Sequence, residues 1–375
     1  MIFTLSILLT VAAVSVSMAM LPAIQSPGTP LGVRVPRERL NELAVRGAIG
    51  RYRLFTLLVG VAAAAVVLAG VKFPLLAGLS SVVVIVGSLW AYVTQRKHII
   101  NAKVAGGWFD EVETAITGAI NTPTAGETSR RLAEFPTPRT PWLWIANSAL
   151  SIVISVLIVA QHWAEIPDVV ATHWGPQLEA DAWADKSIWS VFSLSFINTF
   201  MLVLFAGVTS AITWGYVRGR NDQTIRGRLR ASANLAAANQ GMGILMFLII
   251  CALSLAQIVT VTPGLERWIG PVFVTTLVLS VGSIFPLLGL VMRAQGKVDA
   301  LLRGVTLPDD NKESPDNDQY YKWGVFYYNP NDPAVLVEKR AGVGMDFNYG
   351  TWQGKAFLAF VVLVLLASVL LPLLL

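Results

Sequence analysis

The chain has 375 residues, of which 54% are hydrophobic and only 14% are charged, whereas soluble domains have roughly 25% charged residues. This composition predicts a membrane protein, and it excludes a disordered chain because disordered segments are poor in apolar residues. The only cysteine, Cys251, excludes an intrachain disulfide scaffold. The net charge of +5 becomes informative only when the charges are assigned to loops.

Eight segments of the chain lack Asp, Glu, Lys and Arg and are long enough to cross a bilayer core, which takes roughly 17 to 25 helical residues. Only Lys72 separates the second segment from the third, so we expect these two to form a helical hairpin. The first segment lacks the preceding basic residues of a signal peptide, which favours an uncleaved helix. The segments are 2–24, 54–71, 73–94, 141–163, 189–217, 237–259, 269–292 and 356–375.

Basic residues divide unequally between the two sides of these spans. The loops 25–53, 95–140, 218–236 and 293–355 together carry 25 of the 28 Lys and Arg residues. Because basic loops stay on the cytoplasmic side, this division predicts that both termini lie outside the cell. The three basic residues then expected outside are Lys72, Lys186 and Arg267.

In the first basic loop, 25–53, Pro36 favours an extended backbone at the start, and the residues after it permit a helix. This order predicts an amphipathic, basic helix that lies in the membrane plane. Each Lys or Arg near an anionic lipid surface contributes about 1 kcal/mol to membrane binding. We therefore favour lipid anchoring over a specific partner site, both here and in the five-arginine loop from Arg218 to Arg230. The next loop, 95–140, ends in a linker from Asn121 to Thr140 and shows no catalytic pattern. The expected lipid-anchoring residues are Arg34, Arg37, Arg39, Arg226, Arg228 and Arg230.

Residues 293–355 form the largest segment between spans, an acidic linker followed by an aromatic stretch. The runs 322–328, 335–340 and 345–349 are separated by turn-forming residues, which predicts two or three short strands. About 35 residues cannot bury a core of their own. We therefore expect this unit to rest on helix ends or on the bilayer surface, with its aromatic residues used for packing.

The spans contain no Asp, Glu, Lys or Arg, whereas ion-coupled transporters place ionisable residues there at a cost of about 2.5 to 3.5 kcal/mol each. A path for an uncharged solute remains an alternative, because Asn198, Thr199, Gln240 and Gln257 lie in the spans. The chain has three histidines and no zinc-protease, phosphate-loop or nucleophile-elbow motif. We therefore expect neither an enzyme nor a cofactor.

The segment 164–188, between the fourth and fifth spans, gathers a histidine, tryptophans, aspartates and a lysine. Two interpretations are open, a folded ligand-binding loop in which His173 and Lys186 each pair with an aspartate, or an interfacial aromatic belt with solvated acids. An enzyme acting on lipid, with His173 and Asp181 or Asp185 as acid and base, is less favoured. The ligand-binding hypothesis names His173, Trp174, Asp181, Trp183, Asp185 and Lys186.

The order of residues in this segment resembles a known pattern. Ile166-Pro167, His173-Trp174, Gly175, Asp181, Trp183 and Lys186-Ser187 resemble the extracytoplasmic-loop domain of unknown function in the SdpI-type immunity protein family of bacterial membrane proteins. The loop 32–36 followed by Tyr52-Arg53 is similar to another segment of that family, and the tail 320–348 resembles a second uncharacterised domain of some members. One difference is that Gly175 directly follows the His-Trp pair, whereas family members commonly have a glycine-centred turn between that pair and the aspartate.

The resemblance implies a multi-pass protein of the bacterial plasma membrane. One branch of the family protects its producer against a secreted toxic peptide and signals through a repressor, so the implied function is immunity or sensing through the loop. The expected partners are the lipid bilayer, a secreted peptide or envelope ligand and a cytoplasmic regulator, with no nucleic acid. The predicted fold is an all-α polytopic membrane protein with about eight transmembrane helices and a small cytoplasmic β-containing segment. It divides into 1–163 (four spans), 164–188 (outside loop), 189–292 (three spans), 293–355 (cytoplasmic segment) and 356–375 (last span).

Overall fold

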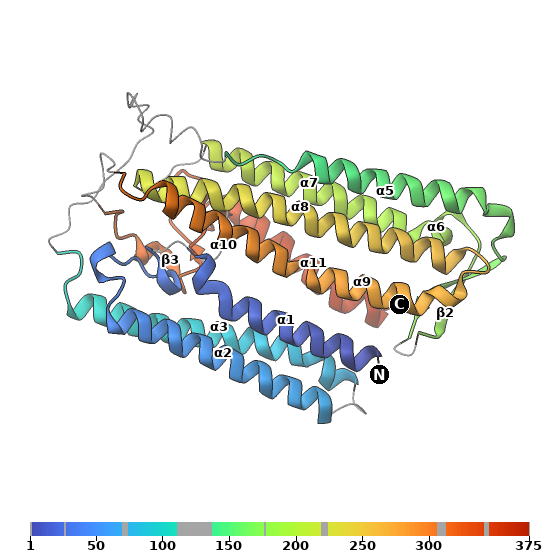
Figure 1. Cartoon of the computed structure of the whole chain (residues 1–375), viewed down its shortest axis with the longest axis horizontal. Helices are drawn as coiled ribbons and strands as arrows, with labels where there is room; N and C mark the ends of the chain where they lie inside the picture. The colour runs from blue at the N-terminus through green and yellow to red at the C-terminus, as the bar shows by residue number, and fades with distance from the viewer. Residues whose placement is uncertain are drawn as a thin grey trace.

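The computed structural model describes residues 2–25, 28–69, 74–110, 137–175, 178–218, 224–305, 313–340 and 345–374. Long helices run side by side through most of the molecule (Figure 1), so the predicted all-α polytopic class is confirmed. These helices are α1 (Ile2–Ile24), α2 (Leu43–Ala69), α3 (Pro74–Ala105), α5 (Trp142–Gln161), α7 (Ser193–Arg218), α8 (Ile225–Val261), α9 (Ile269–Gly282), α10 (Ile284–Leu301) and α11 (Trp352–Leu374).

Among the described residues, six helices are long and apolar enough to cross a membrane, with α9 and α10 counted as one. They correspond to six of the expected spans, and α3 and α11 occupy the other two, 73–94 and 356–375. Such helices imply a lipid bilayer environment. The expected hairpin of the second and third spans is formed by α2 and α3, whereas Lys72 and most of the linker from Asn121 to Thr140 lie outside the described residues.

The bundle exposes large apolar side chains and buries small polar ones. On α2, Leu54, Leu58 and Val61 are 57% to 68% exposed, whereas the buried hydroxyl of Ser88 on α3 donates to the carbonyl of Val84 on its own helix (2.6 Å). This distribution suits helices that pack through small residues and face lipid tails. The membrane interpretation therefore rests on side-chain placement as well as on helix length.

The helices extend beyond the expected spans at one end of the molecule. The expected in-plane helix of the first basic loop is not present, because α2 already begins at Leu43 and continues to Ala69. No proline interrupts these residues, and a helix that has started gains one hydrogen bond for each added residue. In its described residues, the preceding loop holds two short 3-10 turns, η1 (Pro30–Gly32) and η2 (Arg37–Arg39).

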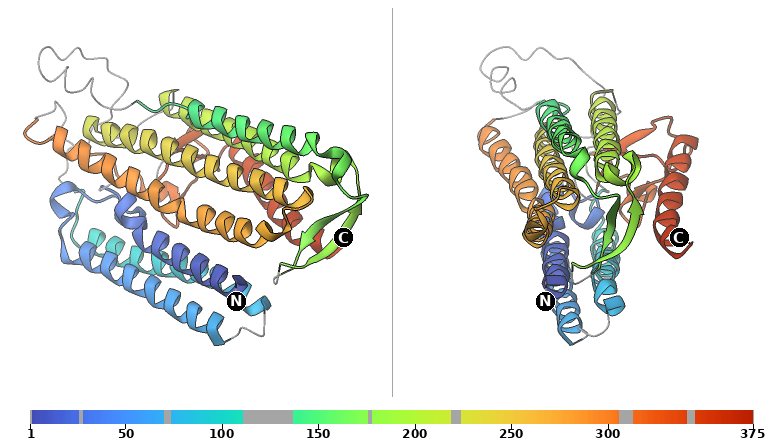
Figure 2. Two further views of the ribbon diagram at one scale, coloured as in Figure 1. Left: turned by 45° about the vertical axis from the view of Figure 1, so that its right-hand side comes forward. Right: turned by 90° about the vertical axis from the view of Figure 1, so that its right-hand side faces the viewer.

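Two β-containing regions lie at opposite ends of the bundle (Figure 2). The hairpin of β1 (Val169–Trp174) and β2 (Ala180–Asp185) lies at the end where α1 begins and α11 finishes. Also at this hairpin end are η3 (Trp163–Glu165), α6 (Ile188–Val191) and η4 (Glu266–Trp268). The loops predicted to be cytoplasmic converge at the other end, which we call the basic end. The arrangement matches the expected alternation of spans, while the side that faces the cytoplasm stays a prediction.

The segment before α11 contains two antiparallel strand pairs, four short strands where the sequence pattern predicted two or three. The 3-10 turn η5 (Asp318–Tyr320) precedes β3 (Tyr321–Lys322) and β4 (Phe326–Tyr327), and β5 (Leu336–Glu338) pairs with β6 (Met345–Phe347). We call residues 313–351 the β unit. It rests on helices, as expected from its size, because Leu336 packs so closely on Gly215 of α7 that a Cβ atom added there would collide with the Leu336 side chain. Asn348, which is fully buried, organises the turn before α11 through its side-chain amide.

Candidate functional site

The hairpin between α5 and α7 is the candidate site predicted from the sequence. Its strands pair antiparallel from Val169 opposite Asp185 to Trp174 opposite Ala180, with register irregularities on both sides of His173. Such bulges twist a strand locally and change the direction of a side chain. The histidine therefore lies at the least regular point of the hairpin.

The base of the hairpin is anchored in the bundle by an apolar cluster. Ile166 and Val170, together with Val159 of α5, Val191 of α6 and Val261 of α8, form this cluster and are 0% to 8% exposed. Five such side chains, from the base of the hairpin and from α5, α6 and α8, fix the position of the hairpin, because each buried aliphatic side chain contributes about 1.5 to 3 kcal/mol. The hairpin is thus a supported structure rather than a loose loop.

Lys186 belongs to this base and does not pair with an aspartate. Its Nζ donates to the carbonyl of Ile166 (2.8 Å) and lies 5.1 Å from the ring centre of Trp163. Its backbone N–H donates to the carbonyl of Asp168 (2.7 Å). The expected Lys186–Asp pair is therefore corrected, because a backbone carbonyl and an aromatic face take the ammonium group instead. Trp163 was not predicted to take part, and a cation–π contact across 23 sequence positions leaves no sequence signal.

His173 and Asp181 do meet, as one of the two predicted pairs. Nδ1 of His173 lies 2.5 Å from Oδ1 of Asp181, and the two side chains are 69% and 46% exposed. The contact can be a neutral hydrogen bond or an ion pair, depending on the protonation of the imidazole. An exposed donor–acceptor pair of this kind is available to a ligand from solution.

The other predicted residues of the hairpin divide between exposed and packed positions. Trp183 is 61% exposed, whereas the ring of Trp174 lies 5.9 Å from that of Phe273 on α9. Asp185 stands at the far end of β2, opposite Val169. The structure therefore brings His173 and Asp181 together on an exposed surface with Trp183 nearby in the strand, and separates them from Asp185 and Lys186.

The arginines expected at lipid headgroups also contact the protein. Arg34 is only 8% exposed and its backbone N–H donates to Asp318 (2.9 Å). The prediction that Arg34 anchors lipid is therefore corrected, because the β unit covers it. The other contacts are those of Arg37 with Glu313 and Thr224, Arg39 with Glu42, Arg226 with the Val305 carbonyl, Arg230 with Asp299, and the Arg228 carbonyl with Tyr216.

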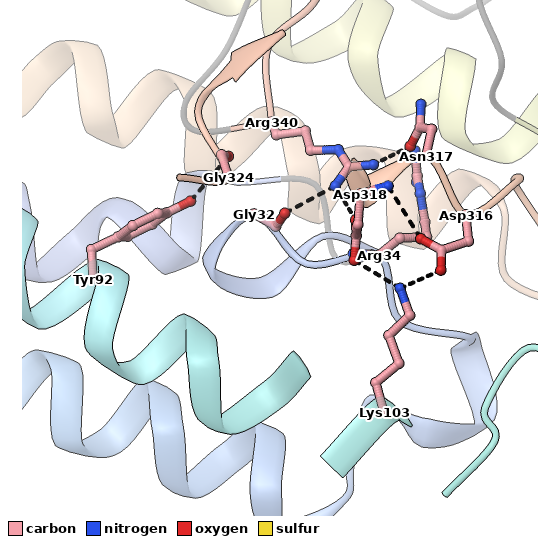
Figure 3. A network of polar contacts seen from close by, with 9 residues as sticks. All are labelled: Gly32, Arg34, Tyr92, Lys103, Asp316, Asn317, Asp318, Gly324 and Arg340. Carbon is pink, nitrogen blue, oxygen red and sulfur yellow. Dashed lines mark hydrogen bonds and ion pairs between the residues drawn. The ribbon is translucent and has the colours of Figure 1, made fainter. Parts of the chain in front are cut away.

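A buried charge network, which the sequence did not predict, joins the β unit to the bundle (Figure 3). Arg340, 3% exposed at its side chain, pairs with Asp318 and donates to the carbonyl of Gly32 (2.9 Å). Lys103 at the end of α3 reaches Oδ2 of Asp316 (2.6 Å) and Oδ2 of Asp318 (2.7 Å). Three segments far apart in sequence meet here. No periodicity or motif links them, so the sequence alone offers no signal for this network.

The network keeps Asp318 ionised although it is largely buried. Burial alone would raise its pKa, but the positive charges of Arg340 and Lys103 outweigh burial and hold the pKa of Asp318 below its ordinary value. A carboxylate between two cations with an additional backbone N–H donor is satisfied at neutral pH. The network therefore serves as a structural connection, since its acids and bases already bind one another.

Two regions of the chain match known family models. Residues 150–199, which contain part of α5, the hairpin and the start of α7, match a domain of unknown function, DUF1648. Residues 330–355, which contain β5, β6 and the first turn of α11, match a family of unknown function, DUF5808. No curated protein and no solved structure matches the chain. The matches agree with an uncharacterised kind of multi-pass membrane protein, and membership of the SdpI-type family stays a prediction.

Proposed function

We propose that this protein is a non-enzymatic protein of the bacterial plasma membrane that recognises a secreted peptide or an envelope ligand through the hairpin 164–188. The observation that carries the proposal is the exposed His173–Asp181 pair beside Trp183 on an anchored hairpin. A rigid support limits the entropy lost when a ligand binds. Recognition at this site gives immunity to a toxic peptide or passes a signal to a cytoplasmic regulator at the basic end.

The proposed orientation has the hairpin and both termini outside the cell. The concentration of 25 of the 28 basic residues in loops on one side supports it. Single cysteines at Glu165 and at Lys322, both exposed, test it in a protein that carries Cys251→Ala. A membrane-impermeant thiol reagent should label the first in intact cells and the second only after permeabilisation. The reverse pattern would contradict the orientation.

The ligand proposal is tested by protection of a sensitive bacterium that expresses the protein and is challenged with a secreted peptide encoded beside its gene. His173→Ala and Trp183→Ala should each reduce protection at equal membrane levels, because binding surfaces depend on a few aromatic and charged contacts. Trp268→Ala is the matched control, since Trp268 is 48% exposed in η4 at the same end of the molecule. Wild-type protection by both hairpin variants would contradict the proposal.

The non-enzymatic part of the proposal extends an expectation from the sequence, and it is tested at the His173–Asp181 pair. Within the described ranges, no group of three or more His, Cys, Asp or Glu residues could hold a metal ion. The exposed His173–Asp181 pair could act as an acid and a base, but no nucleophile is identified beside it. Asp185, the other aspartate of the enzyme hypothesis, lies at the far end of β2. A catalytic activity on lipid substrates that is lost in His173→Ala would contradict the non-enzymatic part of the proposal.

The second candidate function is transport of an uncharged, hydrogen-bonding solute. Asn198 of α7 and Gln257 of α8 face each other's helices inside the spans, contacting Ser254 (3.4 Å) and Ser195 (2.9 Å) respectively. The Oδ1 atom of Asn198 and the Nε2 atom of Gln257 remain buried without hydrogen-bond partners, and such groups usually bind water or a ligand. Solute flux into proteoliposomes that Asn198→Leu abolishes would favour this candidate over the hairpin proposal.

The other two residues of the transport hypothesis do not join this pair. Thr199 donates to the carbonyl of Ser195 on its own helix (2.8 Å). Gln240 accepts a hydrogen bond from the indole of Trp144 on α5 (3.2 Å). Both contacts stabilise helices or helix packing, so the four polar residues do not form one continuous group.

A further inference from the structure

A groove of about 790 Å³ opens beside α7 at the basic end of the molecule. One wall belongs to α7, the floor to the β unit and the other wall to the first turns of α11. Figure 2 shows α11 standing at the edge of the bundle next to the β unit. Residues that represent the three sides are Val203, Gly207 and Ala211 of α7, Leu336 and Phe347 of the β unit, and Phe357 of α11.

The α7 wall of the groove lies within a membrane span. Gly207 and its lining neighbours belong to the candidate span Ser193–Tyr216, and Val203 and Val208 are 66% and 47% exposed. A Cβ atom built at Gly207 meets nothing within 4 Å. An empty apolar space forfeits the dispersion contacts of its lining, and water finds too few polar partners there. Hydrocarbon is therefore the occupant that the lining favours.

An acyl chain is the occupant that already surrounds the groove. The groove, about 790 Å³ in volume, opens beside a candidate membrane span, whose exposed side chains face lipid tails. The rings of Phe347 and Phe357 stack at 4.5 Å between the β unit and α11. A flexible chain can follow this space without the recruitment of a protein partner.

The polar edge of the groove supplies a positive charge. Lys339 lines this edge with an exposed side chain and forms no ion pair with any residue in the described part of the chain. Asp346, an acid that also lines the groove, accepts hydrogen bonds at Oδ1 from the hydroxyl of Tyr349 (3.0 Å) and the N–H of Phe347 (2.8 Å) and does not form an ion pair with Lys339. Lys339 can therefore bind an anion from outside the protein.

Exposed tryptophans mark the depth of this edge in the bilayer. Trp214 near the end of α7 is 57% exposed, and Trp352 at the start of α11 is 74% exposed. Tryptophan concentrates at the level of the lipid headgroups. The groove thus runs from the headgroup level into the hydrocarbon, with a cation at its outer edge.

We propose that the groove binds an anionic phospholipid of the leaflet at the basic end. Its acyl chain packs on Gly207 and Phe357, and its phosphate pairs with Lys339. The bound lipid fills the gap between α7 and the pair formed by the β unit and α11. This inference does not rest on the function proposed for the hairpin, because the groove lies at the opposite end of the bundle.

Native mass spectrometry of the full chain, released from detergent after titration with phosphatidylglycerol, tests the proposal. Wild-type protein should retain one lipid more than Gly207→Leu, whose side chain fills the groove and also improves helix propensity. The matched control is Gly289→Leu on α10, because its added side chain also begins in open space and lies outside the groove. Gly289→Leu should retain lipid as the wild type does.

A second variant separates chain binding from headgroup recognition. Lys339→Gln should reduce the preference for phosphatidylglycerol over phosphatidylcholine of the same chain length about fivefold, the effect of one basic residue near an anionic surface. Equal lipid retention by the wild type and by correctly folded Gly207→Leu would overturn the proposal. Retention of a second copy of the protein chain, lost in Gly207→Leu, would also overturn it and would assign the groove to an oligomer interface.

Discussion

The two ends of the molecule use charged side chains in opposite ways. At the hairpin end, the side chains of His173 and Asp181 are 69% and 46% exposed. At the basic end, those of Arg340 and Asp318 are only 3% and 15% exposed. Water screens an exposed pair, which contributes about 0 to 1 kcal/mol, whereas a buried pair that loses one member leaves an uncompensated charge. The buried pair therefore holds the structure together, and the exposed pair is free to serve recognition.

The buried network and the exposed pair differ because they connect different parts of the chain. Arg340 binds a loop between α1 and α2, and Lys103 brings in the end of α3, so the buried network joins segments that are distant in sequence. His173 and Asp181 belong to one hairpin, whose strand pairing already holds them close together. Loss of the exposed pair therefore leaves the hairpin in place, whereas loss of Arg340 or Asp318 also removes contacts of the β unit with the loop before α2 and with the end of α3.

The largest expected effect comes from Arg340→Met, which keeps most of the apolar volume and removes the charge. It should lower the free energy of unfolding by about 3 to 5 kcal/mol, because the network loses a buried cation. The control is Arg39→Met, whose exposed pair with Glu42 should change stability by less than about 1 kcal/mol. The unfolding midpoint in detergent measures both, and equal midpoints would show that the buried pair stabilises the fold no more than an exposed pair does.

The second prediction concerns the close approach of two loops beneath this network. Gly32 has φ of +71°, and a Cβ added there would collide with the carbonyl of Gly324 and lie 2.6 Å from the hydroxyl of Tyr92. The backbone strain alone costs about 1 to 3 kcal/mol, so Gly32→Ala should lower the unfolding midpoint clearly. Gly28→Ala in the same loop, where the nearest atom lies at 3.7 Å, should remain close to wild type. Similar midpoints for the two variants would contradict this account.

The third prediction uses the pH dependence of the buried network. The pKa of Asp318 in the folded protein is below its ordinary value, which is about 3.9 in an unfolded chain. The stability it contributes is therefore complete above about pH 4 and is lost as the pH falls through the folded pKa. Wild type should be more stable than Asp318→Asn at pH 7, and the difference should shrink below pH 4. A difference that is constant with pH would exclude ionised Asp318 as its source.

The sequence predicted the elements that depend on local composition. Charge-free runs located the spans because lipid excludes charged side chains, and alternating aromatic runs located the strands around Tyr321 and Phe347. The pairing of His173 with an aspartate of the same segment was anticipated from the residue types and their short separation, whereas the strand register that selects Asp181 was not. The contacts of Arg34, Lys103 and Arg340 were not, because they depend on how three distant segments pack.

A sequence reading also assigned too much to the membrane surface. The basic residues of the first loop were expected in an in-plane helix, yet α2 starts at Leu43 and the β unit covers Arg34. Positive charge in a loop shows which side of the membrane the loop prefers. It does not show whether an arginine meets a lipid phosphate or an aspartate of the same chain, since both satisfy a guanidinium group.

The smallest expected effect on stability belongs to the exposed pair, and the same hairpin provides a contrast to it. Asp181→Asn should change the free energy of unfolding by less than about 1 kcal/mol, because both side chains remain solvated without the pair. Lys186→Met should cost about 1.5 to 3 kcal/mol, since it removes a charge-assisted hydrogen bond to the Ile166 carbonyl and the contact with Trp163.

The measurement is the unfolding midpoint at neutral pH, followed by the protection assay at matched membrane levels. If the pair serves recognition, Asp181→Asn should lose protection while keeping its midpoint, and Lys186→Met should lose protection only to the extent that it loses folded protein. A strongly destabilised Asp181→Asn would make the pair a structural element like the buried network. The contrast between the two ends of the molecule would then disappear, because charged groups at both ends would serve the fold.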